Sequence, residues 1–341
     1  MLVLLSYLHG SGRGEPSPLD FAARLRTWVN MGLRALDTLP LGLGQTVGAV
    51  VQHESFLENP AGAAYAVWVE RGRDVAPNGS LMRTHPLGPM CLWMTLERTF
   101  EVAASFSIVT HVDPRCVVAC VAGTALVRGL LRGEVSEERH IDEVVDAAVE
   151  WYLRWRAEAE KADESRKGDP TLDIGELYRH SRAGTLDDLQ LDDEPRIGYV
   201  YKTFGSGVLL LRQAMRQMAS ATGTIKTEVN MFEPLVTNLI MHGGDADTNA
   251  CFAGALLGAY LGFKALPPNW RDGLRHGQWL LDKSEALRIV LRIGSGSYSG
   301  AMDKDTHPDG GRGMLTKEQM EERWAALQAK LDPDLRESRN A

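Results

Sequence analysis

The sequence has few cysteines, and this shortage limits the class of protein it encodes. Its four cysteines are far too sparse for a disulfide-rich scaffold; they are Cys91, Cys116, Cys120 and Cys251. Cys116 and Cys120 are four residues apart, on one face of an expected helix, but no further soft ligand follows at a metal-binding spacing. We therefore expect reduced cysteines packed in a core, as in an intracellular, cytoplasmic protein.

Basic charge and long apolar runs are also lacking. With 37 Lys and Arg against 45 Asp and Glu, the net charge is −8, and no basic stripe is available for nucleic acid. The apolar runs 1–8 and 251–266 are too short to cross a bilayer, and Lys264 interrupts the second. We therefore expect neither nucleic acid nor a membrane as a partner. The acidic stretch 187–194 is predicted to be a solvated loop, and the alternative interpretation is that it forms a cation site.

Alternating strand patterns are nearly absent, whereas helical spacing recurs throughout. Phe21, Leu25, Trp28 and Val29 are spaced three and four apart, and similar patterns predict helices over 100–109, 117–131, 141–155, 199–218 and 249–263. The polar stretch 158–195 is expected to form an exposed excursion with short helices. The last thirty residues are expected to form a surface helix with a frayed end. These patterns predict an all-α fold in a single domain.

One segment combines glycines with oxygen ligands. In residues 241–250, Gly243 and Gly244 precede Asp245, Asp247 and Thr248, and a helix begins there. Carboxylate and hydroxyl oxygens are the ligands that Mg²⁺ and Mn²⁺ prefer. The alternative is a capped helix, in which Asp247 or Thr248 accepts hydrogen bonds from the first turn. Small residues follow on this helix and predict close helix packing; they are Ala250, Ala253, Gly254, Gly258 and Gly262.

Three loops carry candidate ligand contacts. The first is 77–83, where Asn78, Gly79 and Ser80 enter a helix, a pattern that suits phosphate or ribose oxygens and is also an ordinary turn. The second is 107–114, where His111 either contacts a ligand or caps a helix C-terminus. The third is the glycine-rich loop 41–46, with Gly42 and Gly44. A dinucleotide-binding fold would require a strand before this loop, and no strand pattern precedes it.

Together these segments resemble the ADP-ribosylglycohydrolase family. Gly243-Gly244-Asp245-x-Asp247-Thr248 is similar to the family's C-terminal metal motif, and four further segments match in family order over about residues 20 to 290. In the 77–83 loop, Pro77 replaces the usual first glycine. The resemblance implies a single compact orthogonal helical bundle over 1–294, with residues 295–341 as a C-terminal extension.

The resemblance also implies an activity and its residues. The activity is metal-dependent hydrolysis of the glycosidic bond between ADP-ribose and a protein side chain or small acceptor. The implied ligands of a binuclear Mg²⁺ or Mn²⁺ centre are Asp245, Asp247 and Thr248. The implied substrate contacts are Asn78, Gly79, Ser80, Met82, His111, Gly42 and Gly44. Arg83 is expected to be a structural ion-pair partner, and no general acid or base is assigned.

The sequence departs from the family at its start. Family members carry a Thr-Asp-Asp-Thr metal motif immediately before the first apolar helix, which here is residues 1–8. We therefore expect half of the metal ligands to be missing, one loosely held ion, impaired activity, and apolar surface exposed on residues 1–8. The alternatives are an ADP-ribose-binding pseudo-hydrolase without turnover and a structural protein of the same fold.

Overall fold

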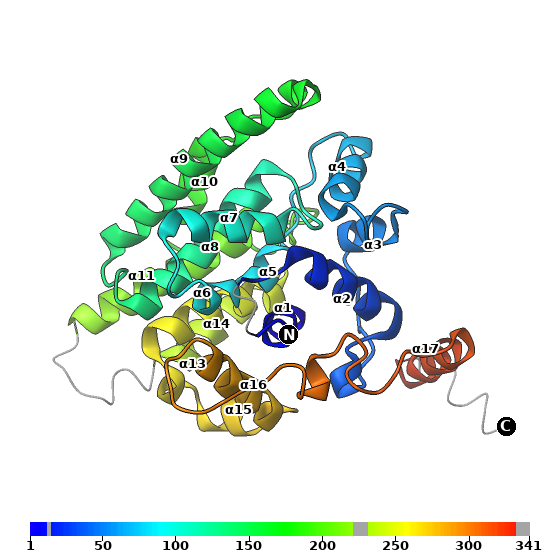
Figure 1. Ribbon diagram of the computed structural model, residues 1–341. Helices are drawn as coiled ribbons and strands as arrows, with labels where there is room; N and C mark the ends of the chain where they lie inside the picture. The colour runs from blue at the N-terminus through cyan, green and yellow to red at the C-terminus, as the bar shows by residue number, and fades with distance from the viewer. Residues whose placement is uncertain (12–14, 221–230, 332–341) are drawn as a thin grey trace.

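A computed structural model describes residues 1–11, 15–220 and 231–331, and helices dominate this part of the chain (Figure 1). Over these residues there is no strand, only the isolated bridges Leu33–Thr38 and Pro77–Tyr199. The predicted all-α class is therefore confirmed. The frayed end expected at the C-terminus lies outside the described residues.

The α-helices have the following bounds: α1 Leu2–His9, α2 Pro18–Met31, α3 Gln45–Gln52, α4 Pro60–Glu70, α5 Leu81–Thr84, α6 Leu87–Met90, α7 Leu96–Ser107, α8 Pro114–Arg132, α9 Glu138–Ala162, α10 Ile174–Ser181, α11 Val200–Ser220, α13 Phe232–Met241, α14 Ala246–Leu261, α15 Pro268–Asp272, α16 Gly277–Val290 and α17 Lys317–Leu331. Short 3₁₀ turns are η1 Arg34–Leu36, η2 Glu164–Gly168, η3 Asp187–Leu189, η4 Phe263–Ala265 and η5 Lys304–Thr306.

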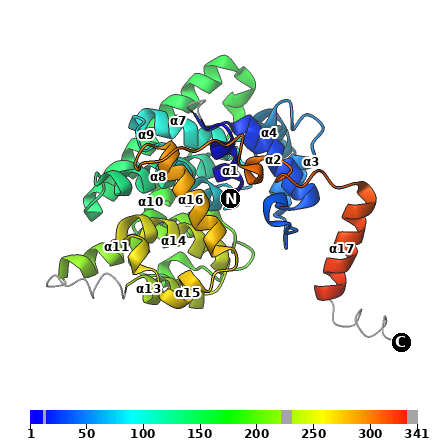
Figure 2. The same cartoon turned by 60° about the horizontal axis from the view of Figure 1, so that its bottom comes forward.

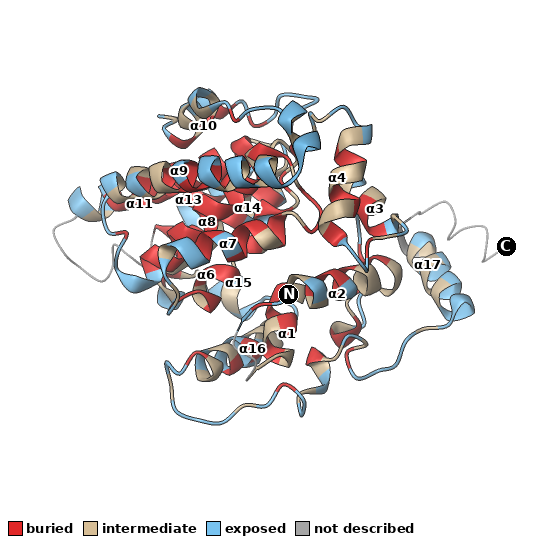
Figure 3. Cartoon of the chain, turned by 45° about the horizontal axis from the view of Figure 1, so that its top comes forward, coloured by how far each residue is buried: buried red, intermediate tan, exposed pale blue. Residues whose placement is uncertain are grey.

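Helix α8 is the centre of the bundle, and α5, α6, α7, α9, α11 and α14 pack around it (Figures 1 and 3). It begins at Pro114, with the Asp113 side chain accepting a hydrogen bond from the Arg115 backbone N–H, and it ends at Gly133, whose φ is +71°. Among the described helices, α8 is the one long and apolar enough to span a membrane, but 89% of that window is buried inside the molecule. A buried core helix passes the same test of length and composition.

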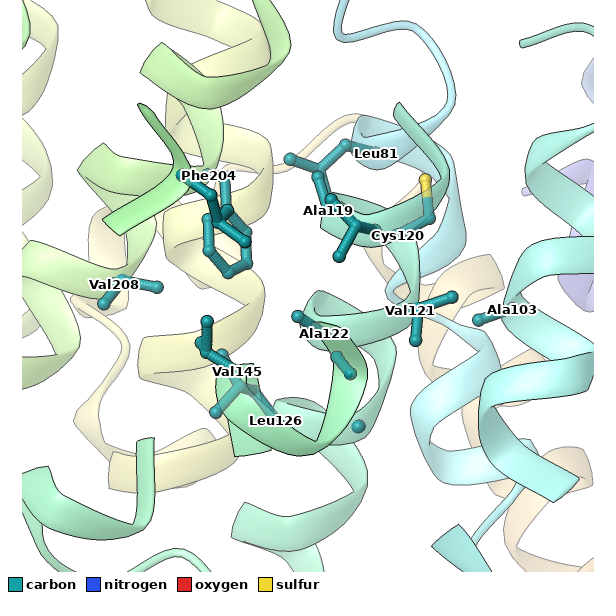
Figure 4. Close-up of a cluster of buried hydrophobic side chains, with 14 of the residues drawn as sticks. Leu81, Ala103, Ala119, Cys120, Val121, Ala122, Leu126, Val145, Phe204 and Val208 are labelled. Atoms are coloured by element: carbon teal, nitrogen blue, oxygen red, sulfur yellow. The ribbon is translucent and has the colours of Figure 1, made fainter. Parts of the chain in front are cut away.

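Close packing of α14 against the core depends on glycines of its neighbours. A Cβ at Gly207 of α11 would lie 2.5 Å from the Phe252 ring, and one at Gly123 of α8 would lie 2.9 Å from it. Figure 4 shows Phe204 of α11 beside the buried side chains of α8 in this core. The expectation that the small residues of α14 itself provide the close approach was wrong at Gly258, where a Cβ would meet nothing within 4 Å. Phe252 is instead the side chain that projects into the neighbours.

Helix α1 is covered by residues from the other end of the chain, which we call the C-terminal strap (residues 297–313). A Cβ at Gly300 would lie 2.0 Å from the Leu8 carbonyl oxygen, so the strap backbone touches α1. Lys283 of α16 anchors the strap through Asp303, with 2.6 Å between Nζ and Oδ2. The apolar surface expected on residues 1–8 is therefore mostly absent: Leu8 is fully buried, and α2 and α16 also contact α1.

The remaining peripheral segments differ in how firmly they pack. Residues 158–195 contain the expected short helices η2, α10 and η3, but the segment is not wholly exposed, because Leu177, Leu186, Leu189 and Leu191 are buried. These leucines pack against the core, which the polar composition of the stretch concealed. Helix α17 lies at the periphery of the molecule, beyond the strap (Figure 2), and Arg323 joins it to the body by donating to Asp37 Oδ1 at 2.7 Å.

Candidate functional site

The loop before α14 turns sharply at two glycines. Gly243 and Gly244 have φ values of +72° and +66°, a region that L-residues rarely adopt. A Cβ at Gly244 would lie 2.0 Å from the carbonyl oxygen of Leu191, so only glycine fits there. The prediction that these glycines permit unusual backbone angles is confirmed. The turn lies beside residues 187–194, and it places Asp245 at the start of α14.

The Asp245 side chain faces other side chains and does not cap α14. It accepts no hydrogen bond from the backbone of the first turn of the helix. Instead its Oδ2 accepts a hydrogen bond from Asn78 Nδ2 at 2.7 Å. Burial raises the pKa of Asp245, and the neighbouring Asp247 carboxyl raises it further. The capped-helix alternative therefore does not apply to Asp245, but it is confirmed for Asp247, whose Oδ1 accepts a hydrogen bond from the Thr248 backbone N–H at 2.8 Å.

The side chains of Asp245, Asp247 and Thr248 lie together at the start of α14, because Asp245 forms side-chain hydrogen bonds with both of the others. Carboxylates and a hydroxyl suit Mg²⁺ or Mn²⁺. In the described part of the chain no three His, Cys, Asp or Glu side chains gather as a metal site. The donor set therefore fits one ion completed by water, and has too few carboxylates for two.

Asn78 joins three elements at this site. Its backbone N–H donates to the Gly198 carbonyl at 2.9 Å, and its Nδ2 donates to Thr203 Oγ1 of α11 at 2.9 Å as well as to Asp245. Thr203 in turn donates to Asn249 of α14 at 2.6 Å. With its amide nitrogen occupied, Asn78 holds the position of the Asp245 carboxylate. This network ties the 77–83 loop to the metal motif predicted from the sequence.

A cavity of about 870 Å³ opens beside this network. It is lined by all of the predicted site residues except Ser80 and Asp247, namely Gly42, Gly44, Asn78, Gly79, Met82, His111, Asp245 and Thr248. Ser80 is fully buried, and its hydroxyl accepts a hydrogen bond from the Cys120 thiol at 3.3 Å. Asp247 lies at the exposed start of α14. The cavity volume is within the range of small-ligand sites.

His111 lies against Gly79 in the lining of this cavity. Its side chain is 3% exposed, and its Nδ1 lies 2.6 Å from Thr110 Oγ1. Burial lowers the pKa of His111 well below its ordinary value, and the Arg83 charge lowers it further. The ring bonds a side-chain hydroxyl and not a carbonyl at a helix end, so the alternative that His111 is a C-terminal cap does not describe it.

Arg83 differs from its expected role. Its guanidinium donates to Thr110 Oγ1 at 2.6 Å and to the carbonyls of Gly79 and Phe106 at 3.3 Å. None of the described carboxylates pairs with it, so the expectation of an ion pair was wrong. Arg83 therefore contributes an unneutralised positive charge to the cavity wall.

A part of the cavity lining was missed by the sequence analysis. Phe21, Leu25 and Trp28 of α2 line it, together with Ile197. The helical spacing of the α2 residues identified them as core positions, and nothing in that pattern distinguishes a core face from a cavity wall. At the mouth, the exposed Arg71 reaches the glycine-rich loop, where its Nη2 donates to the Gln45 carbonyl at 3.4 Å.

A second cavity, of about 520 Å³, lies between α4 and the end of α9. Its walls are aromatic, with Tyr65 and Trp68 from α4 and Tyr152 and Trp155 from α9. None of the predicted site residues lines it. The convergence of predicted residues therefore singles out the larger cavity as the candidate site.

Comparison with known proteins agrees with this arrangement. The family model described as ADP-ribosylglycohydrolase matches residues 1–296, which is most of the chain. The chain belongs to the ADP-ribosylglycohydrolase family. Of curated relatives, ADP-ribosylhydrolase ARH3 of Xenopus tropicalis is 22% identical over 206 residues, covering 59% of this chain and 56% of that protein. ADP-ribosylhydrolase ARH3 of Gallus gallus is 24% identical over 208 residues, covering 59% and 54%. The chain spans about half the length of the curated relatives it matches.

Proposed function

We propose that this member of the family binds ADP-ribose conjugates in the 870 Å³ cavity and hydrolyses the glycosidic bond at the distal ribose with the help of a divalent cation. One observation carries the proposal: residues from four segments that are far apart in the sequence line one cavity, and those that were predicted are Gly42, Gly44, Asn78, Gly79, Met82, His111, Asp245 and Thr248. Its polar lining residues include Asn78, His111 and Asp245, and its apolar lining residues offer a surface for a flat base.

In this proposal each residue has a distinct task. Asp245, Asp247 and Thr248 would hold the cation, which when bound would lower the pKa of a water molecule and polarise ribose hydroxyls. Asn78 keeps the Asp245 carboxylate in place through its 2.7 Å hydrogen bond. Cleavage passes through an oxocarbenium-like state at the ribose C1″ atom, whose positive charge the Asp245 carboxylate stabilises. The acceptor is an ADP-ribosylated protein side chain or a small ADP-ribose conjugate.

A second candidate function is binding of ADP-ribose without turnover. It is favoured by the small number of acidic residues in the cavity lining. Among the described residues that line it, Asp245 is the single Asp or Glu. If Asp245 holds a cation, no described lining carboxylate is left to act as general acid or base. A protein with this lining recognises the ligand but protonates the leaving group poorly.

Calorimetry with ADP-ribose, with and without Mg²⁺, tests the proposal together with an assay for ADP-ribose released from an ADP-ribosylated peptide. Cation-dependent binding with release supports the hydrolase, and binding without release supports the second candidate. Asp245→Asn should abolish the effect of the cation. The matched control is Glu150→Gln, which removes one charge from the exposed side of α9 and should change neither readout. Absence of ADP-ribose binding would refute both candidates.

A further inference from the structure

The ring of His111 has a defined hydrogen-bond partner on the side away from the cavity. Thr110 Oγ1 lies 2.6 Å from His111 Nδ1, and the same oxygen lies 2.6 Å from Arg83 Nη2. A guanidinium only donates hydrogen bonds, so Arg83 occupies one lone pair of the Thr110 hydroxyl. The single proton of that hydroxyl must then point elsewhere.

Two arrangements of protons are open to this chain of three side chains. In the first, the Thr110 hydroxyl donates to His111 Nδ1, which carries no proton, and Nε2 carries one. In the second, Nδ1–H donates to Thr110, and the hydroxyl proton needs another acceptor. Thr110 is 1% exposed, and in the described part of the chain its oxygen has only Arg83 and His111 as partners. The second arrangement therefore buries an unsatisfied donor, which costs about 1–3 kcal/mol.

Protonation of both ring nitrogens is disfavoured by the surroundings. The ring is buried, Arg83 lies next to the shared Thr110 hydroxyl, and no described carboxylate pairs with either. A second positive charge would meet the guanidinium without solvent between them. His111 is therefore neutral, with its one proton on Nε2.

The protonated edge of the ring faces the cavity. A Cβ at Gly79 would lie 3.1 Å from Nε2, so the absence of a side chain there lets the ring edge approach the 77–83 loop. His111, Gly79 and Arg83 all line the cavity. Within the described residues Nε2 has no hydrogen-bond partner, and it is left for a ligand.

We propose that Arg83 and Thr110 are positioning residues that hold His111 in its Nε2–H form, so that this corner of the cavity offers its ligand a hydrogen-bond donor and no acceptor. The ligand atom that meets His111 is then an oxygen or nitrogen without a proton, such as a phosphate oxygen. This inference rests on the proposed function only for the identity of the ligand as ADP-ribose. The state of the ring is a property of the free protein.

Nitrogen NMR of the imidazole rings in the ¹⁵N-labelled free protein tests the first part, with His111→Asn used to assign the His111 signals. We expect Nε2 to be protonated and Nδ1 to be unprotonated. Thr110→Val, which removes the hydroxyl with little change of shape, should give a mixture of the two neutral forms. Thr110→Ser keeps the hydroxyl and should restore the single form. A proton on Nδ1 in the wild type, or a Thr110→Val ring identical to the wild type, would overturn the inference.

Calorimetry with ADP-ribose on the same three proteins tests the second part. Thr110→Val should weaken binding by the factor by which the Nε2–H fraction falls, about twofold for an equal mixture of the two forms, while Thr110→Ser should match the wild type. Equal affinity of Thr110→Val and wild type would contradict the positioning role. If the wild type does not bind ADP-ribose, the proposed function fails, and the NMR result alone then decides the inference about the ring.

Discussion

The turn at Gly244 predicts a pair of glycine-to-alanine substitutions with opposite effects on stability. Gly244 has a φ of +66°, which costs an L-residue about 1–2 kcal/mol. Its Cβ would also lie 2.0 Å from the Leu191 carbonyl oxygen, a backbone atom that cannot rotate away. Overpacking of this kind adds about 1–3 kcal/mol. Gly244→Ala should therefore lower the free energy of unfolding by about 2–5 kcal/mol.

Gly258→Ala is the matched control, on the helix that follows the same loop. Gly258 is in the interior of α14, and a Cβ there would meet nothing within 4 Å. Alanine in a helix interior is more stable than glycine by about 0.5–1 kcal/mol, so this variant should be slightly stabilised. Urea denaturation followed by circular dichroism measures both. If Gly244→Ala unfolds at the wild-type urea concentration, the contact between this turn and Leu191 is not as described.

Three further predictions concern the site, a buried histidine and the strap. Asn78→Ala should weaken ADP-ribose binding about tenfold or more in calorimetry, because Asp245 loses the amide that positions it; unchanged affinity would remove Asn78 from the site. Burial lowers the pKa of His85 to about 4. The contribution of His85 to the free energy of unfolding should therefore be complete above pH 6.5 and should fall by about 3 kcal/mol as the pH drops to 4. In His85→Leu this part of the pH dependence of unfolding should vanish. Lys283→Met leaves Asp303 without its cation, and limited proteolysis should then cut within 297–313 while wild type resists.

The sequence was informative where local chemistry determines structure. Helical spacing placed the long core helices, and the Gly-Gly-Asp-x-Asp-Thr string placed Asp245 after a turn that only glycine can make. The loops 77–83 and 107–114 also identified Asn78 and His111 as candidate ligand contacts, and both residues line the same cavity. In each case the residue's own backbone preference or side-chain chemistry was the signal.

What the sequence did not reveal depended on contacts between distant segments. The sequence around Arg83 does not predict that its guanidinium donates to Thr110 and to two backbone carbonyls instead of to a carboxylate. Ser80 belongs to the same loop as Asn78, yet it points into the core toward Cys120. Tertiary packing determines which side chains of a short loop face a cavity and which face the core. Two residues that are close together in such a loop can therefore point in opposite directions.

The cover that the C-terminal strap gives to α1 has a consequence for synthesis. Helix α1 is made long before Gly300 and Thr306, which pack against it. Until the strap has been made, the nascent chain must therefore keep an apolar helix that lacks part of its native cover, a state prone to aggregation. Emergence of the strap from the ribosome, and not emergence of α1 and its neighbours in sequence, should mark the moment when the region around α1 becomes protease-resistant.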